Sequence, residues 1–281
     1  MTIDFRLGLI GHPLGHSLSP KIHAAALAAC GLSGSYTLFP IPPDDISGLQ
    51  ALLARLRAGE MHGLNVTIPH KQNVLSLLDE LTETAKAIGA VNTVSARNGR
   101  LIGDNTDAPG FLADLTRFLE ISKIKHRKSA IILGAGGSAR AVVYALCRAG
   151  WRVIIAARRI EQAQQLATSF TQHTIRATDF SHLPSFILPD SSFILVNTTP
   201  LGMTPAIETC PWPENIPLPA GAAVYDLVYN PRETRLVREA RAAGLPAITG
   251  LGMLIEQAAL AFEIWTGCQP PRAALWQAAE H

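Results

Sequence analysis

Residues 130–140 read AIILGAGGSAR and join a short apolar run to a glycine-rich turn. The run at 130–133 has the composition of a buried strand, and an apolar segment that ends near Gly150 follows the turn. Glycines permit a tight turn and a close backbone approach, and the start of a following helix offers unpaired N–H groups to a pyrophosphate. The strand, turn and helix together predict a dinucleotide-binding unit.

The next strand bears on which dinucleotide would bind. It spans residues 153–157 and ends at Ala157, where an NAD-binding unit would usually carry an acidic side chain for the ribose hydroxyls. Arg158 and Arg159 follow instead, and a guanidinium suits a 2′-phosphate by charge and geometry. The sequence therefore favours NADP over NAD. The alternative is that the arginines only solvate the start of a helix.

Strand and helix patterns alternate along the rest of the chain, which predicts an α/β fold. Predicted strands cover residues 5–10, 35–41, 63–68, 89–94 and 192–196, with short strands beginning at 101 and 222. Predicted helices cover residues 20–30, 42–57, 71–78, 82–88, 109–119, 234–243, 253–265 and 270–279. A proline-rich stretch at 205–219 is predicted to be a surface loop.

The composition excludes several classes of protein. The 281 residues are 48% hydrophobic and carry a net charge of +2, so no strong field would attract nucleic acid or an anionic membrane. The four cysteines are widely spaced, which argues against a disulfide framework or a zinc site and favours the cytoplasm. His12 and His16 have metal-ligand spacing only on a helix, and they lie in a predicted loop, so we expect no metal. We expect neither a targeting segment nor a membrane span.

Polar residues gather near strand ends and loops in the first third of the chain. They are Ser17, Ser19, Asn65, Thr67, Lys71, Asn92 and Asp107. Four of them have a simpler interpretation: Ser17 could be a turn residue, Ser19 and Asp107 could cap helices, and Lys71 could be a solvated surface residue. Taken with the dinucleotide unit, they favour hydride transfer between NADP(H) and a hydroxylated small molecule.

The chain resembles the shikimate dehydrogenase family along nearly its whole length. The matching motifs are Ser17–Pro20, Asn65–Lys71, Gly89–Thr93, Asp104–Asp107, Gly134–Arg140, Asn197–Met203, Tyr225–Pro231 and Gly250–Gln257. The resemblance implies reversible NADPH-dependent reduction of 3-dehydroshikimate to shikimate, on the route to chorismate and the aromatic amino acids. We expect a monomer or homodimer.

The resemblance assigns roles to particular residues. It implies that Lys71 and Asp107 form the catalytic pair. It implies substrate contacts by Ser17, Ser19, Asn65, Thr67, Lys71, Asn92, Asp107, Tyr229 and Gln257. It implies cofactor contacts by Gly134, Ala135, Gly136, Gly137, Ser138, Ala139, Ala157, Arg158, Arg159, Thr198, Leu227, Gly250 and Met253.

The family fold implies two domains. Residues 1–107 with 252–281 would form an α/β substrate domain, and residues 108–251 a doubly wound, Rossmann-type NADP-binding domain. The C-terminal helices would return to the first domain, so that Gln257 reaches the substrate, and the cleft would lie between the domains.

Two departures from the family pattern concern the cofactor side of the chain. Ala157 and Arg159 flank Arg158 where the family often has asparagine and threonine, and Thr249 replaces a frequent acid. Two other functions stay open: a quinate or dual quinate/shikimate dehydrogenase, and a non-catalytic NADP(H)-binding sensor.

Overall fold

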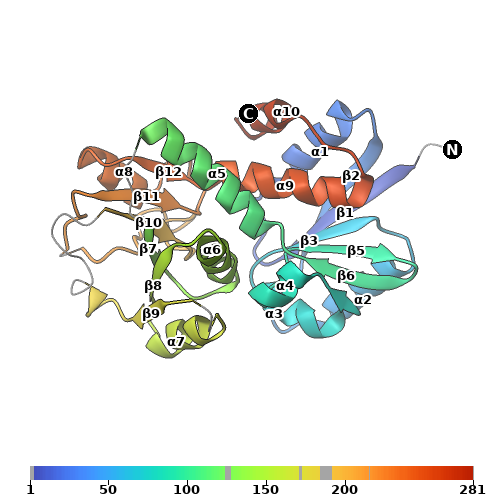
Figure 1. Cartoon of the computed structure of the whole chain (residues 1–281). Coiled ribbons are helices and arrows are strands. Elements are labelled where there is room, and N and C mark those ends of the chain that lie inside the picture. Colours follow the sequence, from blue (N-terminus) through green and yellow to red (C-terminus); the bar gives the residue numbers. More distant parts are fainter. Residues whose placement is uncertain (1–2, 124–127, 171–172, 184–191, 215, 281) are drawn as a thin grey trace. The chain divides into compact units, whose positions relative to one another are not determined.

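The structure is a computed structural model that describes residues 3–123, 128–170, 173–183, 192–214 and 216–280. The chain forms two compact units, coloured along the sequence in Figure 1. Unit 1 comprises Met1–Gly110 with Leu254–His281, and unit 2 comprises Phe111–Met253. The chain enters unit 2 within helix α5 (Asp107–Ser122) and leaves it within helix α9 (Leu251–Thr266).

Unit 1 is built on a six-stranded sheet in the order β2-β1-β3-β5-β6-β4. The strands are β1 (Asp4–Gly11), β2 (Ser33–Pro40), β3 (Gly63–Val66), β4 (Glu80–Leu81), β5 (Thr93–Arg97) and β6 (Arg100–Asp104). β1 is parallel to both β2 and β3, whereas β5 is antiparallel to β3 and β6. The sheet is therefore mixed, and its parallel half brings the carboxyl ends of β1 and β3 to one edge.

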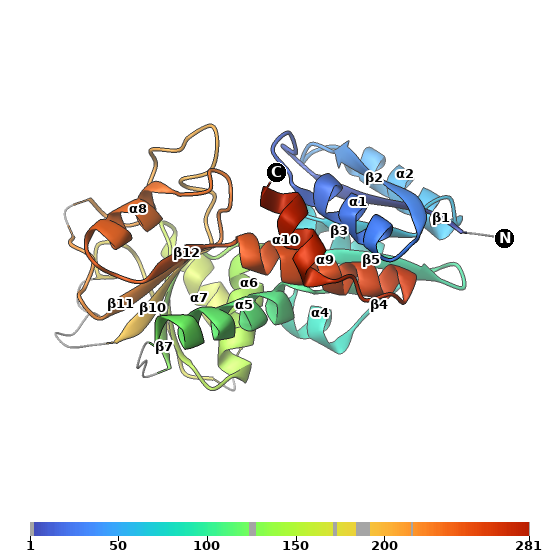
Figure 2. The same ribbon diagram turned by 90° about the horizontal axis from the view of Figure 1, so that it is seen from above.

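The helices of unit 1 pack against this sheet or against one another. They are α1 (Ser19–Ala29), α2 (Ile46–Arg57), α3 (His70–Asn73), the 3₁₀ helix η1 (Val74–Leu77), α4 (Glu83–Ile88), most of α9, and α10 (Arg272–Glu280). The two views show α1 and α10 side by side (Figures 1 and 2). Helix α2 is amphipathic because four leucines recur at i, i+3, i+4 and i+7, and all four are buried against the sheet: Leu49, Leu52, Leu53 and Leu56.

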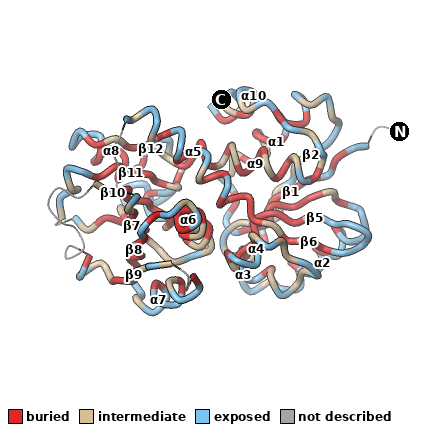
Figure 3. Tube along the Cα trace, viewed as in Figure 1, coloured by how far each residue is buried: buried red, intermediate tan, exposed pale blue. Residues whose placement is uncertain are grey.

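Unit 2 holds a second six-stranded sheet, in which every strand pair is parallel. Its order is β12-β11-β10-β7-β8-β9, formed by β7 (Ser129–Leu133), β8 (Arg152–Ala156), β9 (Ile175–Thr178), β10 (Phe193–Asn197), β11 (Ala222–Asp226) and β12 (Ala247–Thr249). This is the doubly wound order of dinucleotide-binding folds, with the switch point between β7 and β10. Figure 3 shows the central strands buried, and every residue of β10 and β11 is buried.

In the part of unit 2 that the structure describes, three further helices follow: α6 (Gly137–Arg148), α7 (Ile160–Thr168) and α8 (Arg235–Ala242). α6 is the helix predicted after the glycine-rich turn, and Glu161 lies in the first turn of α7. The hydroxyl of Thr234 accepts a hydrogen bond from the backbone N–H of Val237 and so caps α8. The predicted α/β architecture with a doubly wound second unit is confirmed.

The structure also corrects the prediction at several places. Strands β4, β9 and β12 were not predicted, because two to four residues are too few for a recognisable alternation. Ser19 is not an N-cap: it is the first residue of α1, and its backbone N–H donates to the Ser17 hydroxyl at 3.2 Å. The sequence also has a basic segment at 123–128, which is predicted to be a solvated turn, and residues 124–127 of it lie outside the described residues. None of the helices in the described ranges combines the length and the apolar composition that crossing a bilayer demands.

Candidate active site

The loops that follow β1 and β3 lie against each other at the carboxyl edge of the unit 1 sheet. The backbone N–H of His12 donates to the carbonyl of Ile68 at 2.9 Å. A Cβ at Gly11 would lie 2.4 Å from Cγ2 of Thr67, so only glycine allows this approach. Ser17 therefore lies in the loop after β1, and Thr67 lies in the loop after the adjacent strand β3. In open α/β sheets, ligands bind at such strand ends.

Lys71 lies in the short helix α3 that follows this loop, and it is not a surface residue. Only 8% of Lys71 and 4% of Asp107 is exposed. The Lys71 ammonium donates to Oδ2 of Asp107 at 2.6 Å. A charge-assisted bond between two buried groups holds both side chains in fixed positions. The interpretation of Lys71 as a solvated lysine is wrong.

Asp107 can make this contact because another residue caps its helix. α5 begins at Asp107 itself rather than near residue 109. The Oδ1 atom of Asn105 accepts a hydrogen bond from the backbone N–H of Ala108 at 3.2 Å, while its Nδ2 atom donates to the Ala90 carbonyl at 2.9 Å. Asn105 thus acts as the cap, and both carboxylate oxygens of Asp107 are available to side chains.

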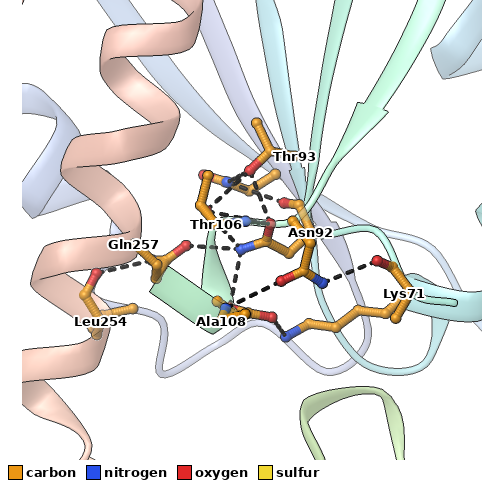
Figure 4. A network of polar contacts seen from close by, with 11 residues as sticks. Lys71, Asn92, Thr93, Thr106, Ala108, Leu254 and Gln257 are labelled. Carbon is orange, nitrogen blue, oxygen red and sulfur yellow. Dashed lines mark hydrogen bonds and ion pairs between the residues drawn. The ribbon is translucent and has the colours of Figure 1, made fainter. Parts of the chain in front are cut away.

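Asn92 is the centre of the polar network drawn in Figure 4, which reaches Lys71 on one side and Gln257 on the other. Its Nδ2 atom lies within hydrogen-bonding distance of three acceptors: Thr106 Oγ1 at 2.9 Å, Asp107 Oδ1 at 2.9 Å and Gln257 Oε1 at 3.2 Å. Since an amide nitrogen carries two hydrogens, acceptors outnumber donors here. The network can therefore accept a hydrogen bond from a ligand that supplies O–H groups.

The other side of Asn92 is also engaged. Its Oδ1 atom accepts from the Thr106 backbone N–H at 2.7 Å and from the Thr93 hydroxyl at 3.0 Å. Its backbone carbonyl accepts from Nδ2 of Asn65 at 3.1 Å. The structure thus brings together five of the predicted residues, which come from separate segments of unit 1: Asn65, Lys71, Asn92, Asp107 and Gln257.

The chemical character of the network follows from its members. Lys71 supplies a cationic N–H donor, Asp107 an anionic acceptor, and the others are neutral amides and hydroxyls. Among the described residues, no group of three or more His, Cys, Asp or Glu side chains could hold a metal ion. Such a set suits recognition of a polyhydroxylated molecule and transfer of a proton at one position.

In unit 2, the turn after β7 carries the predicted nucleotide-binding glycines. Gly134 has φ of +107°, and a Cβ there would lie 2.8 Å from Oγ1 of Thr198. The Thr198 backbone N–H in turn donates to the Leu133 carbonyl at 2.9 Å, so the turns after β7 and β10 are joined. Gly136 precedes α6, which has no side-chain cap, and a Cβ at Gly136 would meet nothing within 4 Å. An uncapped helix start beside open space fits a pyrophosphate.

The neighbouring strand ends hold other predicted cofactor residues. Arg158 and Arg159 are exposed just after β8, whereas Ala157 is buried. A Cβ at Gly250 would lie 2.3 Å from the carbonyl oxygen of Leu227, so the turns after β11 and β12 are in contact. The exposed guanidiniums beside the uncapped helix fit a dinucleotide with a 2′-phosphate.

Asp226 links the end of β10 and the start of α8 to the turn after β11. It is fully buried at the end of β11, and it accepts hydrogen bonds from Asn197 Nδ2, the Thr234 hydroxyl and the Val228 backbone N–H at 2.7, 2.7 and 3.0 Å. Burial raises its pKa to about 6, against the lowering effect of these donors. Tyr229, a predicted substrate residue, lies half-buried in the turn that Asp226 supports, within unit 2.

Sequence reasoning missed three residues of the network. Thr93 and Thr106 bond directly to Asn92, and their signal was their position inside the motifs of Asn92 and Asp107. Tyr36 donates its hydroxyl proton to Oδ1 of Asn65 at 2.8 Å, and no local pattern marks it.

Three family descriptions match successive parts of the chain. "Shikimate dehydrogenase substrate binding domain" matches residues 9–94, "Shikimate / quinate 5-dehydrogenase" matches residues 119–200, and "Shikimate 5'-dehydrogenase C-terminal domain" matches residues 250–280. Together these ranges include both sides of the polar network and the glycine-rich turn.

Individual proteins match over nearly the full length. The chain is 44% identical over 277 residues to the shikimate dehydrogenase (NADP(+)) of Salinibacter ruber, which covers 96% of this chain and 95% of that protein. The crystal structure of shikimate 5-dehydrogenase from Thermus thermophilus in complex with NADP(H) and shikimate is 40% identical, with a TM-score of 0.84 and 98% coverage of both chains. A quinate dehydrogenase from Corynebacterium glutamicum in complex with NAD is 35% identical, with a TM-score of 0.84 and the same coverage.

Proposed function

The chain belongs to the shikimate dehydrogenase family, and from this we propose that it catalyses the reversible NADPH-dependent reduction of 3-dehydroshikimate to shikimate. It is an NADP-dependent oxidoreductase. The observation that carries the assignment of residues is the buried pair of Lys71 and Asp107, 2.6 Å apart within an acceptor-rich network. Bound NADPH supplies the hydride for this reaction.

In the proposed mechanism, Lys71 handles the proton. Its ammonium donates a proton to the carbonyl oxygen as that oxygen becomes an alkoxide, and in the reverse direction the amine takes the proton back. Asp107 holds the Lys71 ammonium in position through Oδ2, while the Asn92 amide holds the other carboxylate oxygen at 2.9 Å. Positioning both groups before the substrate arrives lowers the cost of reaching the reactive geometry.

The remaining polar residues are proposed to bind the substrate. Thr106, Asp107 and Gln257 offer three acceptors to the two amide hydrogens of Asn92, so a ring hydroxyl would supply the missing hydrogen. We assign the substrate contacts to Ser17, Ser19, Asn65, Thr67, Lys71, Asn92, Asp107, Tyr229 and Gln257. Unit 1 is thereby proposed as the substrate-binding unit.

Unit 2 is proposed to bind NADP. The uncapped start of α6 would receive the pyrophosphate, and Arg158 with Arg159 would receive the 2′-phosphate. We assign the cofactor contacts to the turn at 134–139 and to Ala157, Arg158, Arg159, Thr198, Leu227, Gly250 and Met253. The four cysteines form no disulfide, which supports a reducing compartment such as the cytoplasm. We propose a monomer or homodimer.

The test is an absorbance assay of nicotinamide reduction with shikimate or quinate and with NADP or NAD. Activity with shikimate and NADP above every other combination is the expected result. Preference for quinate would reassign the substrate, and preference for NAD would remove the phosphate role of the arginines. Silence in every combination, with nucleotide still bound, would indicate a sensor instead of an enzyme.

A further inference from the structure

The amide of Asn65 is held in one orientation by two neighbours. Its Nδ2 atom lies 3.1 Å from the backbone carbonyl of Asn92, which can only accept a hydrogen bond. The amide nitrogen must therefore face Asn92, and Oδ1 must face the Tyr36 hydroxyl at 2.8 Å. Tyr36 is consequently the donor of that bond.

Tyr36 reaches Asn65 from two strands away. In the register of the unit 1 sheet, Tyr36 of β2 pairs with Leu7 of β1, and Asn65 of β3 pairs with Leu9 of the same central strand. The phenol thus crosses about 10 Å of sheet, twice the spacing of neighbouring strands. A side chain shorter than tyrosine could not make this contact.

His23 of α1 supports the Tyr36 ring. The imidazole and the phenol are stacked, with ring centroids 4.3 Å apart and planes 4° from parallel. Phe262 and Trp265 of α9 enclose the imidazole from other directions, at centroid distances of 6.2 and 5.5 Å. His23 is fully buried, and among the described residues neither of its ring nitrogens makes a well-formed hydrogen bond.

The protonation state of His23 suits its role as a packing partner of the Tyr36 ring. Burial lowers its pKa from 6.5 to about 3, and the nearby Asn65 amide raises it only in part. The imidazole is therefore neutral near neutral pH and acts as a flat packing surface for the phenol. The stack leaves the Tyr36 hydroxyl at the rim of the polar network, where a phenylalanine would pack equally well but could not bond to Asn65.

We propose that Tyr36, stacked on His23, is a positioning residue that fixes the Asn65 amide for substrate binding. This inference rests on the proposed function, in which Asn65 contacts the substrate. Tyr36 acts through Asn65 and has no part in the proton transfer at Lys71. Loss of its hydroxyl should therefore weaken substrate binding without lowering the turnover rate of the bound substrate.

A double-mutant cycle separates this role from a general structural one. Tyr36→Phe keeps the stacked ring, and we expect it to raise the KM for shikimate about 3- to 10-fold, the worth of one neutral hydrogen bond. We expect kcat and the KM for NADP to stay within about twofold of wild type. In an Asn65→Ala background, Tyr36→Phe should add less than about a twofold further change. Thermal unfolding of each variant checks that the fold is intact.

Ser33→Ala is the matched control. It removes a side-chain hydrogen bond from the same strand, since the Ser33 hydroxyl donates to Asp4 Oδ1 at 2.7 Å on the exposed end of β2. It should leave all kinetic constants unchanged. Equal effects of Tyr36→Phe in the wild-type and Asn65→Ala backgrounds, or an unchanged KM for shikimate, would overturn the inference. A wild-type protein inactive on shikimate would instead overturn the proposed function and the inference with it.

Discussion

Replacing Lys71 with methionine separates the structural role of the ion pair with Asp107 from its proposed catalytic role. Methionine keeps most of the side-chain length but removes the ammonium, and the Asp107 carboxylate then stays buried with Asn92 Nδ2 as a remaining donor at 2.9 Å. The side chains of Lys71 and Asp107 are only 10% and 6% exposed, so solvent screens the pair little. Removing one partner of such a pair typically costs ~3–5 kcal/mol. Because Asn92 still donates to Asp107, we expect a loss of about 3 kcal/mol in the free energy of unfolding.

Activity should fall for a different reason. General acid catalysis contributes ~100- to 10,000-fold, so Lys71→Met should lower kcat by that factor. The affinity for NADP should stay near normal, because the proposed cofactor contacts lie on the strand ends of unit 2. Urea unfolding and turnover measurements give the two quantities independently.

The double variant Lys71→Met/Asp107→Asn is the decisive control. Asparagine has the shape of aspartate without its charge, so no uncompensated charge remains buried. We expect about 2 kcal/mol of the lost stability to return while kcat stays low. A Lys71→Met enzyme with kcat within about tenfold of wild type would remove Lys71 from the chemistry. A double variant no more stable than Lys71→Met would show that the buried charge was not the cause of the loss.

Three other predictions concern stability and binding. Because folding lowers the pKa of His23 from 6.5 to about 3, its contribution to stability is complete above pH 6.5 and is lost as the pH falls towards 3. Each pH unit below 6.5 lowers the free energy of unfolding by about 1.4 kcal/mol, so the total loss is about 2 kcal/mol at pH 5. The free energy of unfolding of His23→Phe, measured in urea, should lack this dependence on pH. A Cβ at Gly110 would lie 2.8 Å from the backbone nitrogen of Gln257, so Gly110→Ala should destabilise unit 1 by ~1–3 kcal/mol in thermal unfolding and raise the KM for shikimate. Gly134→Ala should weaken NADP binding in a fluorescence titration, since φ of +107° and the 2.8 Å approach to Thr198 both oppose a side chain and cost ~1–3 kcal/mol.

The parts of the fold that the sequence predicted are those with strong local signals. The turn at 134–140 lies between an apolar strand and an apolar helix. The glycines predicted the turn and the apolar runs predicted the strand and the helix, so the two signals were consistent. Thr82 and Thr234 cap α4 and α8 through their hydroxyls, at the predicted starts of those helices. Strand direction has no such signal, so the antiparallel pairing of β3 and β5 could not be read from the sequence.

The site residues also differ in whether a local sequence signal marked them. Residues at strand ends, such as Asn65 and Asn92, stood out because polar side chains interrupt apolar runs. The simpler interpretation of Asp107 as a cap was removed only by the structure, in which Asn105 takes the capping position. Tyr36 could not be found from the sequence, because its contact with Asn65 depends on the order of three strands.

The position of Asn92 in the proposed substrate site also bears on where the substrate range of this protein is easiest to alter. Its side chain contacts Thr93, Thr106, Asp107 and Gln257, and the last of these is 165 residues away in the sequence. A change at Asn92 would disturb all four contacts at once, and several simultaneous substitutions would be needed to restore them. Ser17, Thr67 and Tyr229 are only half-buried and lie in loops. Engineering of new specificity should therefore begin at these loop residues and leave Asn92 unchanged.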